Sequence, residues 1–79
     1  MKVKVTLYGL LEAYLPGENR SNPAFFELEE GTTIEDVFDR LQIPNDAPKL
    51  LFLNGVHVEK NAILEDGDQV GAFPLVAGG

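Results

Sequence analysis

The sequence predicts one small α+β domain, in which a single main helix packs on one face of a mixed sheet of four to five strands. Three observations support this fold class. Residues 2–8 alternate between apolar and polar side chains, residues 34–41 repeat apolar side chains at helical spacing, and residues 50–73 contain short strand-like runs separated by turn signals. Two strands, one helix and then three strands are the order of an α+β roll.

The alternating segment is the first strand, with Val3, Val5 and Leu7 on its buried face. Residues 10–23 combine apolar side chains with two proline-containing turn signals, which predicts a short helical turn followed by an irregular loop. We expect the apolar residues of this segment, Leu10 among them, to cover one end of the core.

A second strand is predicted over residues 24–29, with Ala24, Phe26 and Leu28 on one face and Phe25 on the other. We therefore expect Phe25 to be exposed, and on that ground alone it is a candidate docking residue for a partner. A stray surface aromatic, or a core residue after a register slip, is the alternative interpretation of Phe25.

The helix is predicted to begin at Thr32, because Glu35 three residues later completes a capping box at a helix start. Pro44 has no N–H donor and restricts the residue before it, so the helix should be about ten residues long and end by Gln42. Its buried face is formed by Ile34, Val37, Phe38 and Leu41.

The remaining strands follow from apolar runs and turns. Residues 50–53 are a continuous apolar run, and Asn54-Gly55 supplies the two positive-φ positions of a tight hairpin turn, so a short return strand follows. The last strand is predicted over residues 69–73, with Gly71 a weak point inside it.

The composition restricts the partners that the protein can bind. A net charge of −7 at pH 7 repels phosphate backbones and anionic lipid and suits a basic partner protein. The sequence contains no cysteine, so it offers neither a disulfide nor a thiolate metal ligand. It also contains no membrane-length apolar stretch and no signal-peptide core. We expect a cytoplasmic protein with no metal site and no nucleic-acid or membrane partner.

The end of the sequence is the strongest candidate for a functional site. We divide the chain into a domain, residues 1–74, and an extended tail, residues 75–79, that ends in Gly-Gly. Five extended residues span at most about 17 Å, and glycines without a Cβ atom pass through a narrow channel. An α-carboxylate on such a stalk is ionised at neutral pH and is a potential nucleophile. A frayed end is the alternative interpretation.

Several of these segments resemble a known family. Residues 66–70, Asp-Gly-Asp-Gln-Val, and residues 73–79, Phe-Pro-Leu-Val-Ala-Gly-Gly, look like the closing strand and tail of small β-grasp sulfur carriers of molybdopterin and thiamine biosynthesis, the MoaD and ThiS type. The helix start at residues 31–36 and the turn at 53–55 also fit, so the resemblance covers the whole chain. It implies a β-grasp, ubiquitin-like fold.

Two positions depart from the family pattern. A second proline is frequent in the family where Leu75 stands, and a larger residue is usual at Gly71. Neither departure touches the reacting group. The long loop at residues 10–23 looks more like the molybdopterin branch than the thiamine branch.

The resemblance implies a role for the tail. An adenylating enzyme of the ubiquitin-activating type (MoeB/ThiF-like) uses ATP to join the terminal carboxylate to AMP, and a sulfide or persulfide then displaces AMP to leave a thiocarboxylate. A synthase large subunit (MoaE-like) accepts the sulfur. Carried over to this sequence, Gly79 is the modified residue, Gly78 gives clearance, and Leu75, Val76 and Ala77 thread the partner's channel. The chain itself is then no enzyme and binds no cofactor.

Other interpretations stay open. The chain could be a ubiquitin-like modifier joined through Gly79 to lysines of target proteins, a thiamine-pathway sulfur carrier, or an interaction module with an inert tail. His57 is the only histidine, so we treat it as a solvated residue and not as a metal ligand. Glu27, Glu29 and Glu30, together with the acidic residues of the helix, could form an acidic docking face, although a charge run is usually a solvated face.

Overall fold

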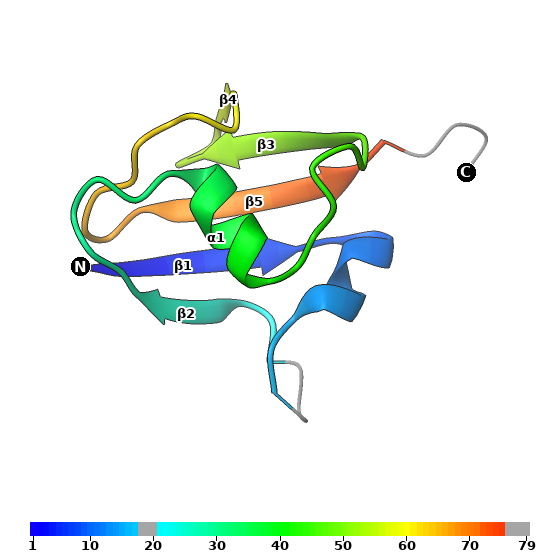
Figure 1. The fold of residues 1–79 in the computed structure, drawn as a ribbon, viewed down its shortest axis with the longest axis horizontal. Coiled ribbons are helices and arrows are strands. Elements are labelled where there is room, and N and C mark those ends of the chain that lie inside the picture. The colour runs from blue at the N-terminus through cyan, green and yellow to red at the C-terminus, as the bar shows by residue number, and fades with distance from the viewer. Residues whose placement is uncertain (18–20, 76–79) are drawn as a thin grey trace.

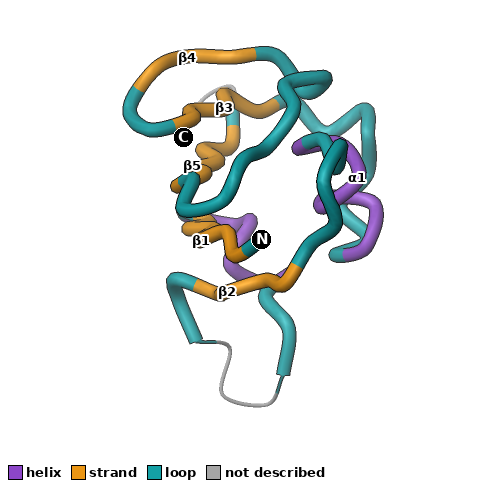
Figure 2. Tube along the Cα trace, turned by 90° about the vertical axis from the view of Figure 1, so that its left-hand side faces the viewer, coloured by secondary structure: helices purple, strands orange, loops and turns teal. Residues whose placement is uncertain are grey.

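A computed structural model of the protein describes residues 1–17 and 21–75. A five-stranded sheet carries one α-helix on one of its faces, and Figure 2 shows the sheet edge-on with the helix beside it. The α+β fold class is confirmed. The elements in chain order are β1 (Lys2–Leu7), the 3₁₀ helix η1 (Gly9–Tyr14), β2 (Ala24–Glu27), α1 (Ile34–Arg40), β3 (Lys49–Leu53), β4 (Val56–Val58) and β5 (Gln69–Pro74).

The sheet has the strand order β2-β1-β5-β3-β4 (Figure 1). β1 and β5 pair in parallel at its centre, and the other three pairs are antiparallel. The sheet is therefore mixed, as predicted. β5 is the central strand, and it ends at the side of the molecule where η1 begins.

The core lies between α1 and the sheet. Val3, Val5 and Leu7 are fully buried on the helix-facing side of β1, and Leu11 and Leu15 close one end of the core. The expectation for Leu10 was wrong, because its side chain is 73% exposed. A 3₁₀ helix has three residues per turn, so it turns only part of a run of adjacent apolar residues toward the core.

The helix starts one residue later than the capping pattern predicted. Thr33, not Thr32, is the N-cap: its hydroxyl accepts from the Asp36 N–H at 3.2 Å, and the Asp36 carboxylate accepts from the Thr33 N–H at 3.0 Å. Thr32 is buried, its hydroxyl donates to the Glu29 carbonyl, and its own carbonyl accepts from the Leu64 N–H at 2.9 Å. Thr32 is thus part of a contact with a distant segment and does not cap the helix.

The helix is also shorter than predicted, with seven residues instead of about ten. It ends because Gln42 adopts a positive φ of 61°, and the Ile43 N–H donates back to the Phe38 carbonyl at 3.0 Å. This is the hydrogen-bond pattern of a Schellman motif. Leu41, expected on the buried face, is only half-buried.

The β3–β4 hairpin forms at the predicted turn, with φ of 52° at Asn54 and 83° at Gly55. Polar side chains fix this turn against the start of β5. The Asn54 side-chain amide donates to Asp68 at 2.9 Å and accepts from the Gln69 N–H at 2.9 Å, while Asp68 also accepts from the Glu65 N–H at 2.7 Å. Asp68 is therefore buried with its carboxylate oxygens paired.

Candidate functional site

The point where β5 ends determines where the tail begins. The Leu75 N–H donates to the Pro48 carbonyl at 3.0 Å, directly after the Lys49–Pro74 register pair of β3 and β5. On the other side Pro74 packs against Gly9, where an added Cβ atom would lie 3.1 Å from the proline ring. The end of β5 is therefore held from two sides. We call Pro74 and Leu75, which make these contacts, the tail root.

Lys49 fixes the loop that supplies the Pro48 carbonyl. Its ammonium group donates to the carbonyl oxygens of Pro44 at 3.1 Å and Ala47 at 2.8 Å. Partial burial of the ammonium group, together with repulsion by Lys60, lowers the pKa of Lys49 against the opposing attraction of Asp46.

The sheet face opposite α1 is not covered by any described element, and we call it the open face. The strand register places Gly71 at its centre, beside Thr6 on β1 and Phe52 on β3. Phe52 in turn pairs with His57 on β4. His57 is exposed there, as expected for a solvated histidine.

Three aromatic side chains cross the open face toward the tail root. Tyr8 and Phe73 stack with ring centroids 4.1 Å apart and an interplanar angle of 4°. Phe52 meets Phe73 edge-on, with centroids 5.6 Å apart. Tyr8 is 41% exposed and Phe73 38% exposed, so these rings present apolar surface to solvent next to Pro74.

The centre of the open face is hollowed. A groove of about 450 Å³ lies over Gly71, with Tyr8, Phe52 and Phe73 among its walls and Lys4 at its border. A second groove of about 440 Å³ continues past Lys4 toward Phe25. Lys4 and Gln69 line both grooves, so the two grooves adjoin along the sheet.

The predicted site residues are only partly within the described chain. Val76, Ala77, Gly78 and Gly79 lie outside the described residues, so their assigned roles stay predictions. Leu75 stands at the tail root with 48% of its surface exposed.

The prediction that Phe25 is exposed is confirmed at 61%, and the Lys2 ammonium lies 5.9 Å from its ring centroid. Its role in docking stays a prediction. The alternation over residues 2–8 puts Tyr8 on the face opposite Val3, Val5 and Leu7, but nothing local in the sequence joins it to Phe52 and Phe73, because they lie far apart in the chain.

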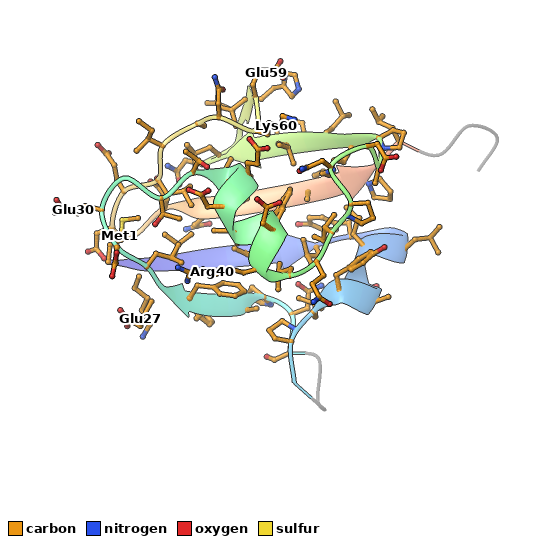
Figure 3. The ribbon with its side chains drawn as sticks, in the orientation of Figure 1. Met1, Glu27, Glu30, Arg40, Glu59 and Lys60 are labelled. Carbon is orange, nitrogen blue, oxygen red and sulfur yellow. The ribbon has the colours of Figure 1, made fainter. Side chains whose placement is uncertain are left out.

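The predicted acidic docking face lies away from the tail root. Figure 3 shows Glu27, Glu30 and the N-terminal Met1 together at the end of the molecule opposite the end of β5. These glutamates are exposed, and the Met1 amino group donates to the Leu28 carbonyl at 2.9 Å. An acidic docking role for this end stays a prediction.

Within residues 1–17 and 21–75, no three His, Cys, Asp or Glu side chains are grouped so that they could hold a metal ion. No α-helix in the described part of the chain has both the length and the apolar character needed to cross a membrane.

Comparison with known proteins identifies the fold. SAMP1 from Haloferax volcanii has a TM-score of 0.76 at 18% identity, and the match covers 100% of both chains. A candidate molybdopterin converting factor subunit 1 from Pyrococcus furiosus has a TM-score of 0.73 at 26% identity, covering 96% of this chain and 99% of that one. A chain from the complex of subunits 1 and 2 of the Helicobacter pylori molybdopterin-converting factor matches at 0.64 and 21% identity, with both chains fully covered.

No curated protein sequence matches the chain. The Mut7-C ubiquitin family matches residues 1–78, which is nearly the whole chain. The β-grasp fold and the resemblance to MoaD/ThiS-type proteins are thereby confirmed, and the chain belongs to the Mut7-C ubiquitin family.

Proposed function

We propose that this ubiquitin-like chain is a sulfur carrier whose Gly79 carboxylate is adenylated by a MoeB/ThiF-like enzyme, converted to a thiocarboxylate and used in molybdopterin biosynthesis. The observation that carries the proposal is the tail root. The last described hydrogen bond of the chain is made at Leu75, beside the exposed aromatic rings of the open face. A partner docked on these rings is well positioned to receive residues 75–79.

The chemistry places few demands on the chain itself. A carboxylate oxygen of Gly79 attacks the α-phosphorus of ATP, and pyrophosphate leaves. The acyl carbon of the resulting adenylate is electrophilic, so a sulfide attacks it and AMP departs with the former carboxylate oxygen. The partner enzyme supplies ATP binding and the sulfur, while this chain supplies the stalk and a docking surface.

The acceptor in this proposal is a MoaE-like large subunit. The support is the fold shared with one chain of the complex between subunits 1 and 2 of the Helicobacter pylori molybdopterin-converting factor. The similarity to the Pyrococcus furiosus protein, which extends over nearly all of both chains, points to the same branch.

Intact-protein mass spectrometry tests the proposal. The full chain is incubated with ATP, a sulfide source and a MoeB/ThiF-like enzyme, next to a matched variant that lacks Gly78 and Gly79. We expect a gain of about 16 Da, the exchange of one oxygen for sulfur, in the full chain only. The absence of this species, with an enzyme that thiocarboxylates its own carrier under the same conditions, would overturn the proposal.

A protein modifier is the second candidate, because SAMP1, a small archaeal modifier protein, shares the fold over the whole chain. The two functions differ in the bond that Gly79 forms. In cell extracts, a modifier gives products of higher mass in which Gly79 is joined to target lysines by an isopeptide bond. A carrier gives the free thiocarboxylate.

A further inference from the structure

The hollow on the open face exists because position 71 has no side chain. Thr6 and Phe52 flank Gly71 across the sheet, and Gln69 and Phe73 flank it along β5. A larger side chain at the centre of this face would fill the groove of about 450 Å³ from below. The glycine therefore contributes to a depression that is walled by aromatic side chains and bordered by the polar side chains of Thr6 and Gln69.

The fold does not itself require a glycine at this position. A Cβ atom on Gly71 would lie 3.8 Å from the Tyr8 ring and 3.9 Å from the Phe73 ring, which are ordinary contact distances. Gly71 is also absent from the glycines with positive φ in the described chain. Glycine inside a strand weakens the strand, and it often marks a place where a ligand or another chain approaches closely.

Lys4 gives the depression a charge. It is half-buried at the border of the groove, and in the described part of the chain it makes no ion pair; the ion pair found there joins Lys60 to Glu35 at 3.9 Å. A cation in this setting attracts a carboxylate more strongly than a fully exposed cation does.

The positive charge of Lys4 contrasts with the acidic character of the rest of the chain. The chain carries a net charge of −7, and acidic residues such as Asp36 and Asp39 lie on the exposed side of α1. On the open face the strand positions with formal charge are Lys2, Lys4 and Glu27. The second groove also has Asp66 and Asp68 in its lining, whereas Lys4 is the one charged residue among the described residues that line the groove over Gly71. The groove over Gly71 therefore accepts an anionic group more readily than a cationic one.

We propose that the hollow over Gly71 is an anchor site for an aliphatic side chain of leucine size on the partner protein, with an adjacent partner carboxylate that pairs with Lys4. The aromatic walls favour an apolar group over a phosphate, and Lys4 disfavours a basic neighbour. This inference rests on the proposed function for the identity of the partner, which is the protein that receives the tail.

The anchor site lies next to the tail root. Phe73 forms a wall of the hollow, stacks on Tyr8 and directly precedes Pro74 in β5. A partner anchored over Gly71 is therefore seated beside the residue where the tail begins. The hollow then determines which partner protein binds. The tail root determines where the partner's channel for the tail must open.

A titration followed by nuclear magnetic resonance tests the anchor site on the full ¹⁵N-labelled chain. The probe is acetyl-Leu-Asp-amide, and the comparison peptides are acetyl-Leu-Asn-amide and acetyl-Ala-Asp-amide. We expect shifts at the amides of Lys4, Thr6, Phe52 and Gly71. Loss of the carboxylate should weaken binding about two- to fivefold. Loss of the leucine side chain should weaken it about tenfold or more.

Matched variants locate the site. Gly71→Leu fills the hollow, and Lys4→Met removes the charge but keeps the aliphatic stem, so both variants should bind the probe peptide more weakly. Gly71→Val is a second variant that fills the hollow, and it shows whether the effect is peculiar to leucine. Lys60→Met removes a cation near α1 and should leave binding unchanged. Equal binding of all three peptides, shifts away from the open face, or unchanged binding to both Gly71 variants would overturn the inference. Because the titration needs neither ATP nor Gly79, its failure is distinct from failure of the mass-gain experiment.

Discussion

Phe38 is the residue on which the small core depends most. Its side chain is 2% exposed, and Lys49 lies with its ammonium group 5.8 Å from the ring centroid. We expect Phe38→Ala to lower the free energy of unfolding by about 3 to 5 kcal/mol, because the core cannot close the space that the ring leaves. Urea denaturation measures this. Phe25→Ala on the exposed side of β2 is the control, with an expected change below about 1 kcal/mol.

Asp68 is the buried polar residue that joins the hairpin to β5. Asp68→Ala would leave the Glu65 N–H and the Asn54 amide without their acceptor, so we expect a loss of about 1 to 3 kcal/mol in the free energy of unfolding. Asp68→Asn keeps the shape and one acceptor oxygen, and it should lose less. An equal loss for both variants would show that the charge, and not the hydrogen bonds, holds the turn.

At the scale of single elements, the sequence predicted what local rules determine. The Asn54-Gly55 hairpin forms where the two positive-φ positions placed it. The helix start was one residue off because the Leu64 N–H donates to the Thr32 carbonyl and the Ile34 N–H donates to the Ala62 carbonyl. These bonds come from a segment about thirty residues away, which a local capping pattern cannot detect.

The helix start gives a prediction that separates the two capping boxes. Thr33→Ala should lower the free energy of unfolding by about 1 kcal/mol, because it removes the acceptor of the Asp36 N–H. Glu35→Gln should change it by less than about 0.5 kcal/mol, because the Glu35 carboxylate makes only a distant pair with Lys60. Thermal or urea unfolding measures both losses. A larger loss for Glu35→Gln than for Thr33→Ala would support the capping box that begins at Thr32 and contradict the one that begins at Thr33.

β5 contains a stability prediction of its own at Gly71. Gly71→Val should raise the free energy of unfolding by about 0.5 to 1 kcal/mol, because a β-branched residue suits a strand and the added atoms meet no backbone. Urea denaturation of this variant is the measurement. A gain in stability together with weaker peptide binding would mark the glycine as a residue retained for recognition. A loss of stability would instead mean that the aromatic rings need the space over Gly71.

At the scale of the whole molecule, the order of the helices and strands along the chain was predictable from the sequence. Which strands lie next to each other in the sheet was harder to predict. The alternation of apolar and polar residues correctly predicted that Phe25 is exposed, and the same alternation over residues 2–8 puts Tyr8 on the face opposite the core. The parallel pairing of β1 with β5, however, brings Tyr8 onto Phe73 and leaves Gly71 between Thr6 and Phe52. No local rule fixes a pairing between segments so far apart in the sequence, so the hollow was not predictable.

A deletion at the tail should affect the thiocarboxylate chemistry without affecting the stability of the domain. Removing Gly78 and Gly79 should leave the melting temperature within about 2 °C of the full chain, because the last residues of most domains contribute little to the fold. The same deletion should abolish the mass gain. Differential scanning calorimetry measures the first result, and a large drop in melting temperature would show that the tail contributes to the fold.

The position of β5 has a mechanical consequence. A force applied to the chain beyond Leu75 acts along the central strand of the sheet, whose hydrogen bonds to β1 on one side and β3 on the other run across the direction of pulling. These bonds share the load in shear, whereas an edge strand such as β4 peels away one bond at a time. In the proposed function, a partner draws the tail into a channel and later releases it, and the central position of β5 allows this without unravelling of the strand that bears the load.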